Sequence, residues 1–278
     1  MQLTQTEPGG TYPCRRPMRI LVVADLGSKA PWYGWLQAQA YRFGLVAISG
    51  DLLDVFSRLP LPAQVANTSA FLTTLAGHVP VAVCSGNHDS VWEFVVQGQE
   101  FRPSWLSRVA SVASLLADGQ TQSVEDRVVV TALGYLATLE QKNRWMAEGA
   151  RLRSQTGLPW LVLHHHPPAT DERIGHEEYC AGLLAAEFQP ELWCSGRLYG
   201  QHSTKGFMWF QRFGSTSVLN AAQLVPAGRV NEAPFPTHIV VDLEAGLASW
   251  HRPGAALASV PVEIRYQSDI HHGKNFGA

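Results

Sequence analysis

The sequence is short of charged residues, and its charges nearly cancel. Charged side chains make up 16% of the 278 residues, below the ~25% usual for soluble domains. The formal net charge is -2, from 21 basic and 23 acidic residues. A chain this close to neutrality has no overall field with which to hold a long nucleic acid or an anionic membrane. We therefore expect neither as a partner, whereas a small anionic ligand at a local site remains compatible with the composition.

Paired cysteines and long apolar runs are also missing. The 4 cysteines lie far apart with no CxxC pair, so the sequence indicates neither a zinc ribbon nor a disulfide framework. No apolar run approaches the ~18 residues needed to cross a bilayer. No apolar stretch follows a basic region near the first residue, as it does in a secretory signal. These shortages predict a soluble cytoplasmic protein, and 46% hydrophobic residues provide for a sizeable core.

The distribution of proline and glycine predicts one domain between two tails. Residues 1–17 contain three prolines, two adjacent glycines and no periodicity, which favours a flexible tail. Residues 18–267 are expected to form a single domain, and residues 268–278 a loose tail. Four aromatic residues in the middle of the chain are expected in the core: Trp92, Phe94, Phe101 and Trp105.

Short apolar runs alternate with helical spacing over much of the domain. Strands are expected at 19–25, 45–49, 79–85, 127–133, 159–168 and 191–196, and helices at 32–41, 63–76, 140–154 and 177–188. The βαβαβ rhythm predicts an α/β fold with a parallel sheet and polar loops at the strand carboxyl ends. Residues 91–126 are expected to be helical and irregular. From residue 206 onward, short strands divided by Gly and Pro suggest a second, largely antiparallel sheet.

Four of the expected strands end in residues that can bind a metal. The residues are Asp25, Asp51 and Asp54 in GDLLD, Asn87, His88 and Asp89 in GNHD, and His164, His165 and His166 before two prolines. Singly, each has an ordinary alternative role as a turn former, a helix cap or a polar loop residue. Because the ends of parallel strands lie side by side, however, these side chains can converge. Such a mixed oxygen and nitrogen set suits Mn²⁺, Fe or Zn²⁺.

The motifs GDLLD and GNHD, placed in this order between Asp25 and HHPP, resemble those of the calcineurin-like metallophosphoesterase superfamily. The resemblance covers most of the chain, and GNHD after a buried strand is its most specific part. It implies a four-layer α-β-β-α sandwich, in which two mixed sheets pack face to face with helices outside. It also implies two adjacent metal sites.

The resemblance assigns roles to the matching residues. Asp25 would be a ligand of the first metal, Asp51 would bridge both metals, and Asn87 and His165 would bind the second. His164 and His166 flank that histidine and are weaker candidates.

Three further residues match the family without being assigned to a metal. The resemblance implies that His88 acts on the leaving oxygen or steadies the phosphate. It also implies that Asp54 or Asp89 orients the His88 ring.

Three positions depart from the family pattern. Gly27 stands where the first motif has a histidine, and Arg197 and Tyr199 stand where the last motif has two. Three of the usual seven side-chain ligands are therefore absent, and we expect at most about one tightly bound divalent transition metal per chain. Tyr199 can bind a metal only as phenolate, and His202 is a possible substitute.

Electrostatics limits what Arg197 can do. A guanidinium ~4 Å from a unit positive charge costs about 4 kcal/mol at an effective dielectric constant of ~20, and roughly twice that beside a dication. Either Arg197 points toward a substrate phosphate, for which its bidentate fork is suited, or no metal occupies that position. Alternatively, Arg197 and Tyr199 close a decayed site.

Two functions follow as alternatives. The first is metal-dependent hydrolysis of a phosphate ester by metal-activated water, with a small phosphodiester or nucleotide as substrate. The second is a degenerate phosphoesterase fold that binds a nucleotide or a protein partner without turnover. A dinucleotide-binding fold is less well supported, because no GxGxxG follows the first strand. Trp32, Tyr33 and Trp35 are either a pocket wall or the core face of the first helix.

Overall fold

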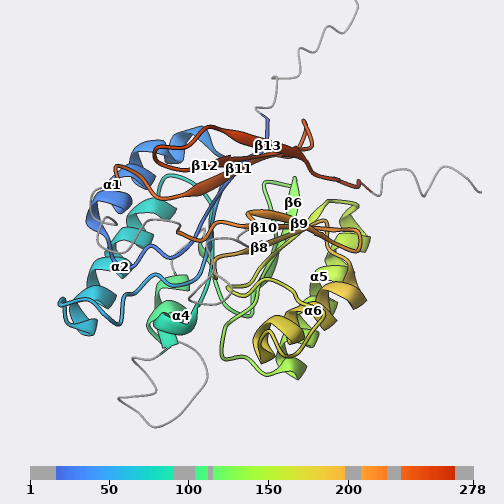
Figure 1. Ribbon diagram of the computed structural model, residues 1–278, viewed down its shortest axis with the longest axis horizontal. Coiled ribbons are helices and arrows are strands. Elements are labelled where there is room, and N and C mark those ends of the chain that lie inside the picture. Colours follow the sequence, from blue (N-terminus) through green and yellow to red (C-terminus); the bar gives the residue numbers. More distant parts are fainter. Residues whose placement is uncertain (1–16, 91–103, 112–114, 198–207, 224–232, 267–278) are drawn as a thin grey trace, which may run out of the picture.

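The protein folds as two mixed β-sheets that face each other, with helices on both outer faces (Figure 1). The structure is a computed structural model that describes residues 17–90, 104–111, 115–197, 208–223 and 233–266. This arrangement confirms the expected four-layer α-β-β-α sandwich. Three of the four expected core aromatics, Trp92, Phe94 and Phe101, lie outside the described residues, whereas Trp105 is 1% exposed and confirms its prediction.

The first sheet has seven strands in the order β13-β12-β11-β1-β2-β3-β4. Their bounds are β1 (Arg19–Val23), β2 (Leu45–Ser49), β3 (Val81–Cys84), β4 (Leu115–Leu116), β11 (His238–Asp242), β12 (Leu247–His251) and β13 (Ala258–Pro261). Strands β1 to β4 are parallel, as the βαβαβ rhythm predicts. Strands β11 to β13 extend the sheet from β1 in antiparallel pairs.

The second sheet has six strands in the order β5-β6-β7-β8-β10-β9. Their bounds are β5 (Thr121–Val124), β6 (Val128–Ala132), β7 (Trp160–Leu163), β8 (Leu192–Ser195), β9 (Phe210–Phe213) and β10 (Thr216–Asn220). Strands β6, β7, β8 and β10 are parallel, and β5 and β9 close the two edges in antiparallel pairs.

The helices cover the outer faces of the two sheets (Figure 1). The first sheet is covered by α1 (Ala30–Gln39), α2 (Leu61–Ala76) and α4 (Ser104–Ala110), with the short 3-10 helix η1 (Ala40–Arg42) after α1. The second sheet is covered by α5 (Leu139–Thr156) and α6 (His176–Phe188). No helix within the described residues combines the length and the apolar character that a membrane crossing requires.

The apolar runs of the central strands arise because both faces of each sheet are buried. In β1, Ile20 and Val22 point into the core between the sheets, while Leu21 and Val23 point into the core under the helices. Strands covered on both faces read as continuous apolar sequence, and this is why their positions were predictable. Trp32 and Tyr33 are 1% and 7% exposed and form the core face of α1, with Trp35 partly buried against the same core. Trp32 also lines a cavity, so it fits both alternatives.

One expectation about the topology was wrong, and another was right only in part. The strands after residue 206 do not form a sheet of their own: β11–β13 extend the first sheet beside β1, and β9 and β10 extend the second beside β8. They satisfy the hydrogen-bonding edges that β1 and β8 would otherwise leave open. The segment 91–126, expected to be helical and irregular, contains the strands β4 and β5 as well as α4.

Candidate metal centre

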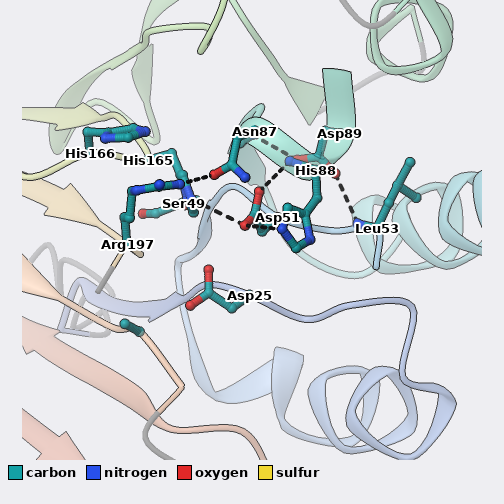
Figure 2. Close-up of polar contacts among 12 residues, drawn as sticks. Asp25, Ser49, Asp51, Leu53, Asn87, His88, Asp89, His165, His166 and Arg197 are labelled. Carbon is teal, nitrogen blue, oxygen red and sulfur yellow. Dashed lines mark hydrogen bonds and ion pairs between the residues drawn. The ribbon is translucent and has the colours of Figure 1, made fainter. Parts of the chain in front are cut away.

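Loops from both sheets meet at the carboxyl ends of four strands (Figure 2). Asp25 follows β1, Asp51 follows β2, and Asn87 and His88 follow β3. His165 follows β7 of the second sheet. The candidate site therefore lies at the carboxyl ends of strands from both sheets, and its side chains come from the segments that follow those strands, with Asn87 and His88 already in a helical segment.

Asp25 and Asp51 both have left-handed backbone conformations, with φ of 53° and 54°. Such a conformation costs of order 1–3 kcal/mol for a residue with a side chain, although Asp tolerates it better than most residues. Backbone hydrogen bonds hold the two turns against each other, from Asp25 N to Gly50 O (3.0 Å) and from Gly27 N to Asp51 O (3.1 Å). The strain therefore aims both carboxylates into the same crevice.

Gly50 allows the loops to approach this closely. Its φ is +86°, and a Cβ there would lie 2.7 Å from His165 Nδ1 and 2.9 Å from the backbone of Gly86. Any other residue at position 50 would force the loops after β2, β3 and β7 apart.

We expect Gly50→Ala to lower the free energy of unfolding by about 1–3 kcal/mol, because it combines overpacking with a strained φ. The matched control is Gly34→Ala in α1, where no atom lies within 4 Å of the added Cβ. There the change should stabilise the helix by about 0.5–1 kcal/mol. Denaturant unfolding of both variants tests this, and equal stabilities would contradict the close approach at Gly50.

Asp25, Asp51 and His165 form one group of candidate ligands. Each offers one ligand atom, and these atoms all lie within 4.8 Å of one another. His165 Nδ1 lies 2.8 Å from the carbonyl oxygen of Ser49, and His165 Nε2 lies 3.3 Å from Asp51 Oδ2. A hydrogen bond from Nδ1–H to that carbonyl fixes the ring with Nε2 toward the carboxylates, as is usual for a metal-binding histidine.

Burial and the neighbouring charges shift the pKa of all three candidate ligands. Burial raises the pKa of Asp25, and the nearby Asp51 charge raises it further. Burial opposes ionisation of Asp51 too, but His165 and His88 outweigh it and hold the pKa of Asp51 below its usual value. Burial would lower the pKa of His165, yet the Asp51 carboxylate raises it.

The donors fit a divalent cation. Asp25 Oδ1 is buried and has no hydrogen-bond partner among the described residues, which is costly for a carboxylate oxygen unless an ion or a donor meets it. Two carboxylates and one imidazole are also the mixed donor set that Mn²⁺, Fe and Zn²⁺ accept. The resemblance placed Asp25 at the first metal only and His165 at the second only. The structure brings both into a single group with Asp51.

Arg197 faces the oxygen that was expected to bind the second metal. Its Nη1 donates a hydrogen bond to Asn87 Oδ1, and its Nε lies 3.8 Å from Glu178 Oε1. The backbone is fixed by bonds from Arg197 N to His165 O (2.9 Å) and from Asn220 Nδ2 to Arg197 O (2.8 Å). The positively charged side chain of Arg197 thus contacts the amide oxygen that was expected to bind the second metal.

His88 contacts Asp51 through its backbone and its ring. Its backbone N–H donates to Asp51 Oδ1 (2.9 Å), and its Nε2 lies 3.9 Å from Asp51 Oδ2. The side chain is 23% exposed, and the ring of Phe56 meets it edge-on at 5.6 Å between centroids. The His88 ring is therefore partly exposed beside Asp51.

Asp54 and Asp89 do not orient the His88 ring through any contact among the described residues, contrary to expectation. Asp89 is buried and accepts from Leu53 N (3.0 Å) and Gly86 N (2.8 Å), so it ties the loops after β2 and β3 together. Asp54 Oδ1 accepts from Phe56 N (2.9 Å) within its own loop. Both residues shape the loops that carry the site.

The flanking histidines pair away from the ligand group. His166 Nδ1 lies 2.7 Å from Glu178 Oε1, and His164 Nδ1 lies 3.0 Å from the backbone oxygen of His166. Glu178, near the start of α6, thus faces both His166 and Arg197. It was not singled out from the sequence, where it carries only the signal of a helix-start acid. Two candidate replacement ligands, Tyr199 and His202, lie outside the described residues.

Comparisons with known proteins give one family match and several structural neighbours. No curated protein sequence matches the chain. The solved structure of TT1561 from Thermus thermophilus shares 15% identity, covers 89% of this chain and 100% of its own, and superposes with a TM-score of 0.53. A metallophosphoesterase from Sphaerobacter thermophilus shares 14% identity, covers 86% of this chain and 89% of its own, and has a TM-score of 0.42.

The sequence profile of the family described as calcineurin-like phosphoesterase matches residues 18–196. Because this match spans more than half of the chain, the protein belongs to the calcineurin-like phosphoesterase family.

Proposed function

We propose that the protein hydrolyses a phosphate ester with one tightly bound divalent transition metal, Mn, Fe or Zn. The observation that carries the proposal is the convergence of Asp25, Asp51 and His165, with Asp25 Oδ1 buried and unpaired among the described residues. The near-neutral charge of the chain favours a small phosphodiester or nucleotide over a long nucleic acid or a membrane surface. We place the reaction in the cytoplasm.

Asp25, Asp51 and His165 would hold the metal. Arg197 and His88 would act on the substrate. When bound, the metal supplies Lewis-acid chemistry, lowering the pKa of a water and polarising a phosphoryl oxygen. Asp51 and His165 are held by the hydrogen bonds described above, so they need little rearrangement to bind. Asn87 becomes available as a further ligand only when Arg197 releases its oxygen.

Arg197 is suited to clamp the phosphate. Its side chain is 40% exposed, so a ligand in the crevice can reach it. Its acceptor here, the amide oxygen of Asn87, is neutral, and a phosphoryl oxygen is the stronger acceptor for a guanidinium. A substrate phosphate can therefore displace Asn87 from Arg197, and the guanidinium then offsets charge that a second metal would otherwise meet.

His88 is suited to give a proton to the leaving oxygen. Its ring is partly exposed and lies beside Asp51. A positioned imidazole there can transfer a proton as the ester bond breaks.

The experiment is hydrolysis of bis(p-nitrophenyl) phosphate by protein loaded with Mn²⁺. We expect turnover that a chelator removes and that added Mn²⁺ restores.

The alternative is a degenerate protein that binds a nucleotide or a protein partner without turnover, and the Arg197–Asn87 pair is the observation that favours it. Thermal stabilisation by a nucleotide, with no hydrolysis under Mn²⁺, Fe²⁺ or Zn²⁺, would replace the proposal with this alternative.

We expect Arg197→Ala to raise KM by about 10- to 150-fold, because a charge-assisted hydrogen bond is worth about 1.5–3 kcal/mol. Metal content should not fall, since Arg197 is not among the metal ligands and its removal leaves the Asn87 oxygen free. The matched control is Arg151→Ala on the exposed face of α5, where Arg151 pairs with Glu148. A silent Arg197→Ala would indicate that Arg197 only closes a decayed site.

A further inference from the structure

A cavity of about 600 Å³ lies next to the metal ligands. One wall is the segment from Gly27 to Trp32, and the other is formed by Asp54, Ser57 and Arg58. Gly27 is two residues from Asp25, a span of at most ~7 Å, and Asp54 is three residues from Asp51, at most ~11 Å. A ligand in the cavity is therefore within reach of a group held at the metal site.

Hydrogen bonds fix these walls to the loops that carry the ligands. Ser28 N donates to Leu52 O (2.7 Å), just after Asp51. Asp54 is held by two bonds with Gln64 of α2, from Asp54 N to Gln64 Oε1 (2.8 Å) and from Gln64 Nε2 to Asp54 O (2.9 Å). These bonds connect both cavity walls to the loops that follow β1 and β2.

Two cations line the cavity without an ion pair to any described residue. Lys29 Nζ lies 4.2 Å from the centroid of the Trp32 ring. It also lies 3.4 Å from the point where a Cβ on Gly27 would stand, so the bare glycine leaves room for the ammonium group. Arg58 is exposed and makes no hydrogen bond with the described residues.

The cavity also contains one carboxylate among its described lining residues, that of Asp54. Asp54 Oδ1 already accepts the Phe56 N–H. The lining therefore has a formal charge of +1, from two cations and one anion. Burial lowers the pKa of Lys29, while Asp54 and Asp25 oppose that change. The ammonium group of Lys29 is half-buried and forms no ion pair with any described carboxylate. An incoming anion could therefore pair with it.

We propose that this cavity is a subsite for a second anionic group of the substrate, a phosphate or a carboxylate attached to the ester that is cleaved. Lys29 and Arg58 would hold that group. The inference rests on the proposed function for its substrate and names the class of that substrate: a phosphate ester bearing a second anion. Lys29 and Arg58 are specificity-determining residues in this account, and they take no part in bond cleavage.

The kinetic test compares two chromogenic diesters, thymidine 5′-(p-nitrophenyl phosphate) with and without a 3′-phosphate. For the unmodified protein loaded with Mn²⁺, we expect kcat/KM to be about 10-fold higher with the 3′-phosphate, as for one charge-assisted contact. Lys29→Met, which keeps the length of the side chain, and Arg58→Met should each reduce this preference. The control Arg42→Met, on η1 outside the cavity, should retain it. A protein that turns over both diesters equally well would overturn the subsite while leaving the proposed function intact.

A binding measurement keeps the subsite testable if no ester is hydrolysed. Calorimetry on the Mn²⁺-loaded protein compares thymidine 3′,5′-bisphosphate with thymidine 5′-monophosphate. We expect the bisphosphate to bind about 10-fold tighter, and the difference to shrink in Lys29→Met and Arg58→Met but not in Arg42→Met. Equal affinities of the two nucleotides in the unmodified protein, or a difference that both cavity variants retain, would overturn the subsite.

Discussion

Asp51→Asn is expected to abolish metal binding and, with it, turnover. The candidate ligand atom of Asp51 lies within 4.8 Å of those of Asp25 and His165, and His165 and His88 favour the charged form of its carboxylate. Removing a residue that only hydrogen-bonds to a metal ligand already lowers metal affinity by about 10–100-fold. Removing the charge of a ligand itself should therefore lower metal affinity by more than that. Elemental analysis after Mn²⁺ loading and dialysis measures the effect.

The substitution separates charge from shape. Asn tolerates the left-handed conformation of position 51, and its oxygen can still accept the backbone N–H of His88. The fold should therefore persist, which circular dichroism can check. Asp54→Asn is the matched control for metal content, since Asp54 accepts from Phe56 N rather than joining the ligand group. An Asp51→Asn protein that keeps its metal would show that the ion binds elsewhere.

His88→Ala is expected to lower kcat by about 10²–10⁴-fold, the usual effect of losing a catalytic acid, while metal content stays the same. The reason is that the contact with Asp51 Oδ1 comes from the backbone N–H of position 88, which alanine keeps. His78→Ala, at an exposed position after α2, controls for loss of a surface imidazole. If His88→Ala loses the metal instead, His88 is a ligand and its assigned role is wrong.

Most of the fold could be predicted because the central strands are covered on both faces. The run 45–48 is continuously apolar and is followed by Ser49, Gly50 and Asp51, so the pattern predicts β2 at its observed bounds. The pairing of β11 with β1 could not be predicted, because it joins residues more than 200 positions apart. Nothing local in either strand specifies that edge.

The candidate site was only partly predictable for the same reason. Asp25, Asp51 and His165 follow apolar strands in recognisable motifs, so the residues could be named from the sequence. Their gathering into one group depends on how the loop after β7, in the second sheet, meets the loops of the first. The contact of Arg197 with Asn87 depends on the same facing of the sheets.

The cavity beside the site had one sequence signal, Trp32, which was expected either in a pocket wall or on the core face of the first helix and which does both. The family motif marks Gly27 only as the position of a missing histidine. In the structure, the absence of a side chain at Gly27 leaves the space beside it to Lys29 Nζ. Arg58 lies in an exposed loop, VFSRLP, that carries no recognisable motif.

The central claim is that one metal, held by Asp25, Asp51 and His165, is enough for phosphoester hydrolysis. The most direct test titrates metal-free protein with Mn²⁺ and follows bound metal and bis(p-nitrophenyl) phosphate hydrolysis in the same samples. We predict that activity rises in proportion to bound Mn²⁺ and levels off at about one ion per chain. Activity that appears only with a second tightly bound ion, or an ion bound at one per chain without any hydrolysis, would contradict the claim.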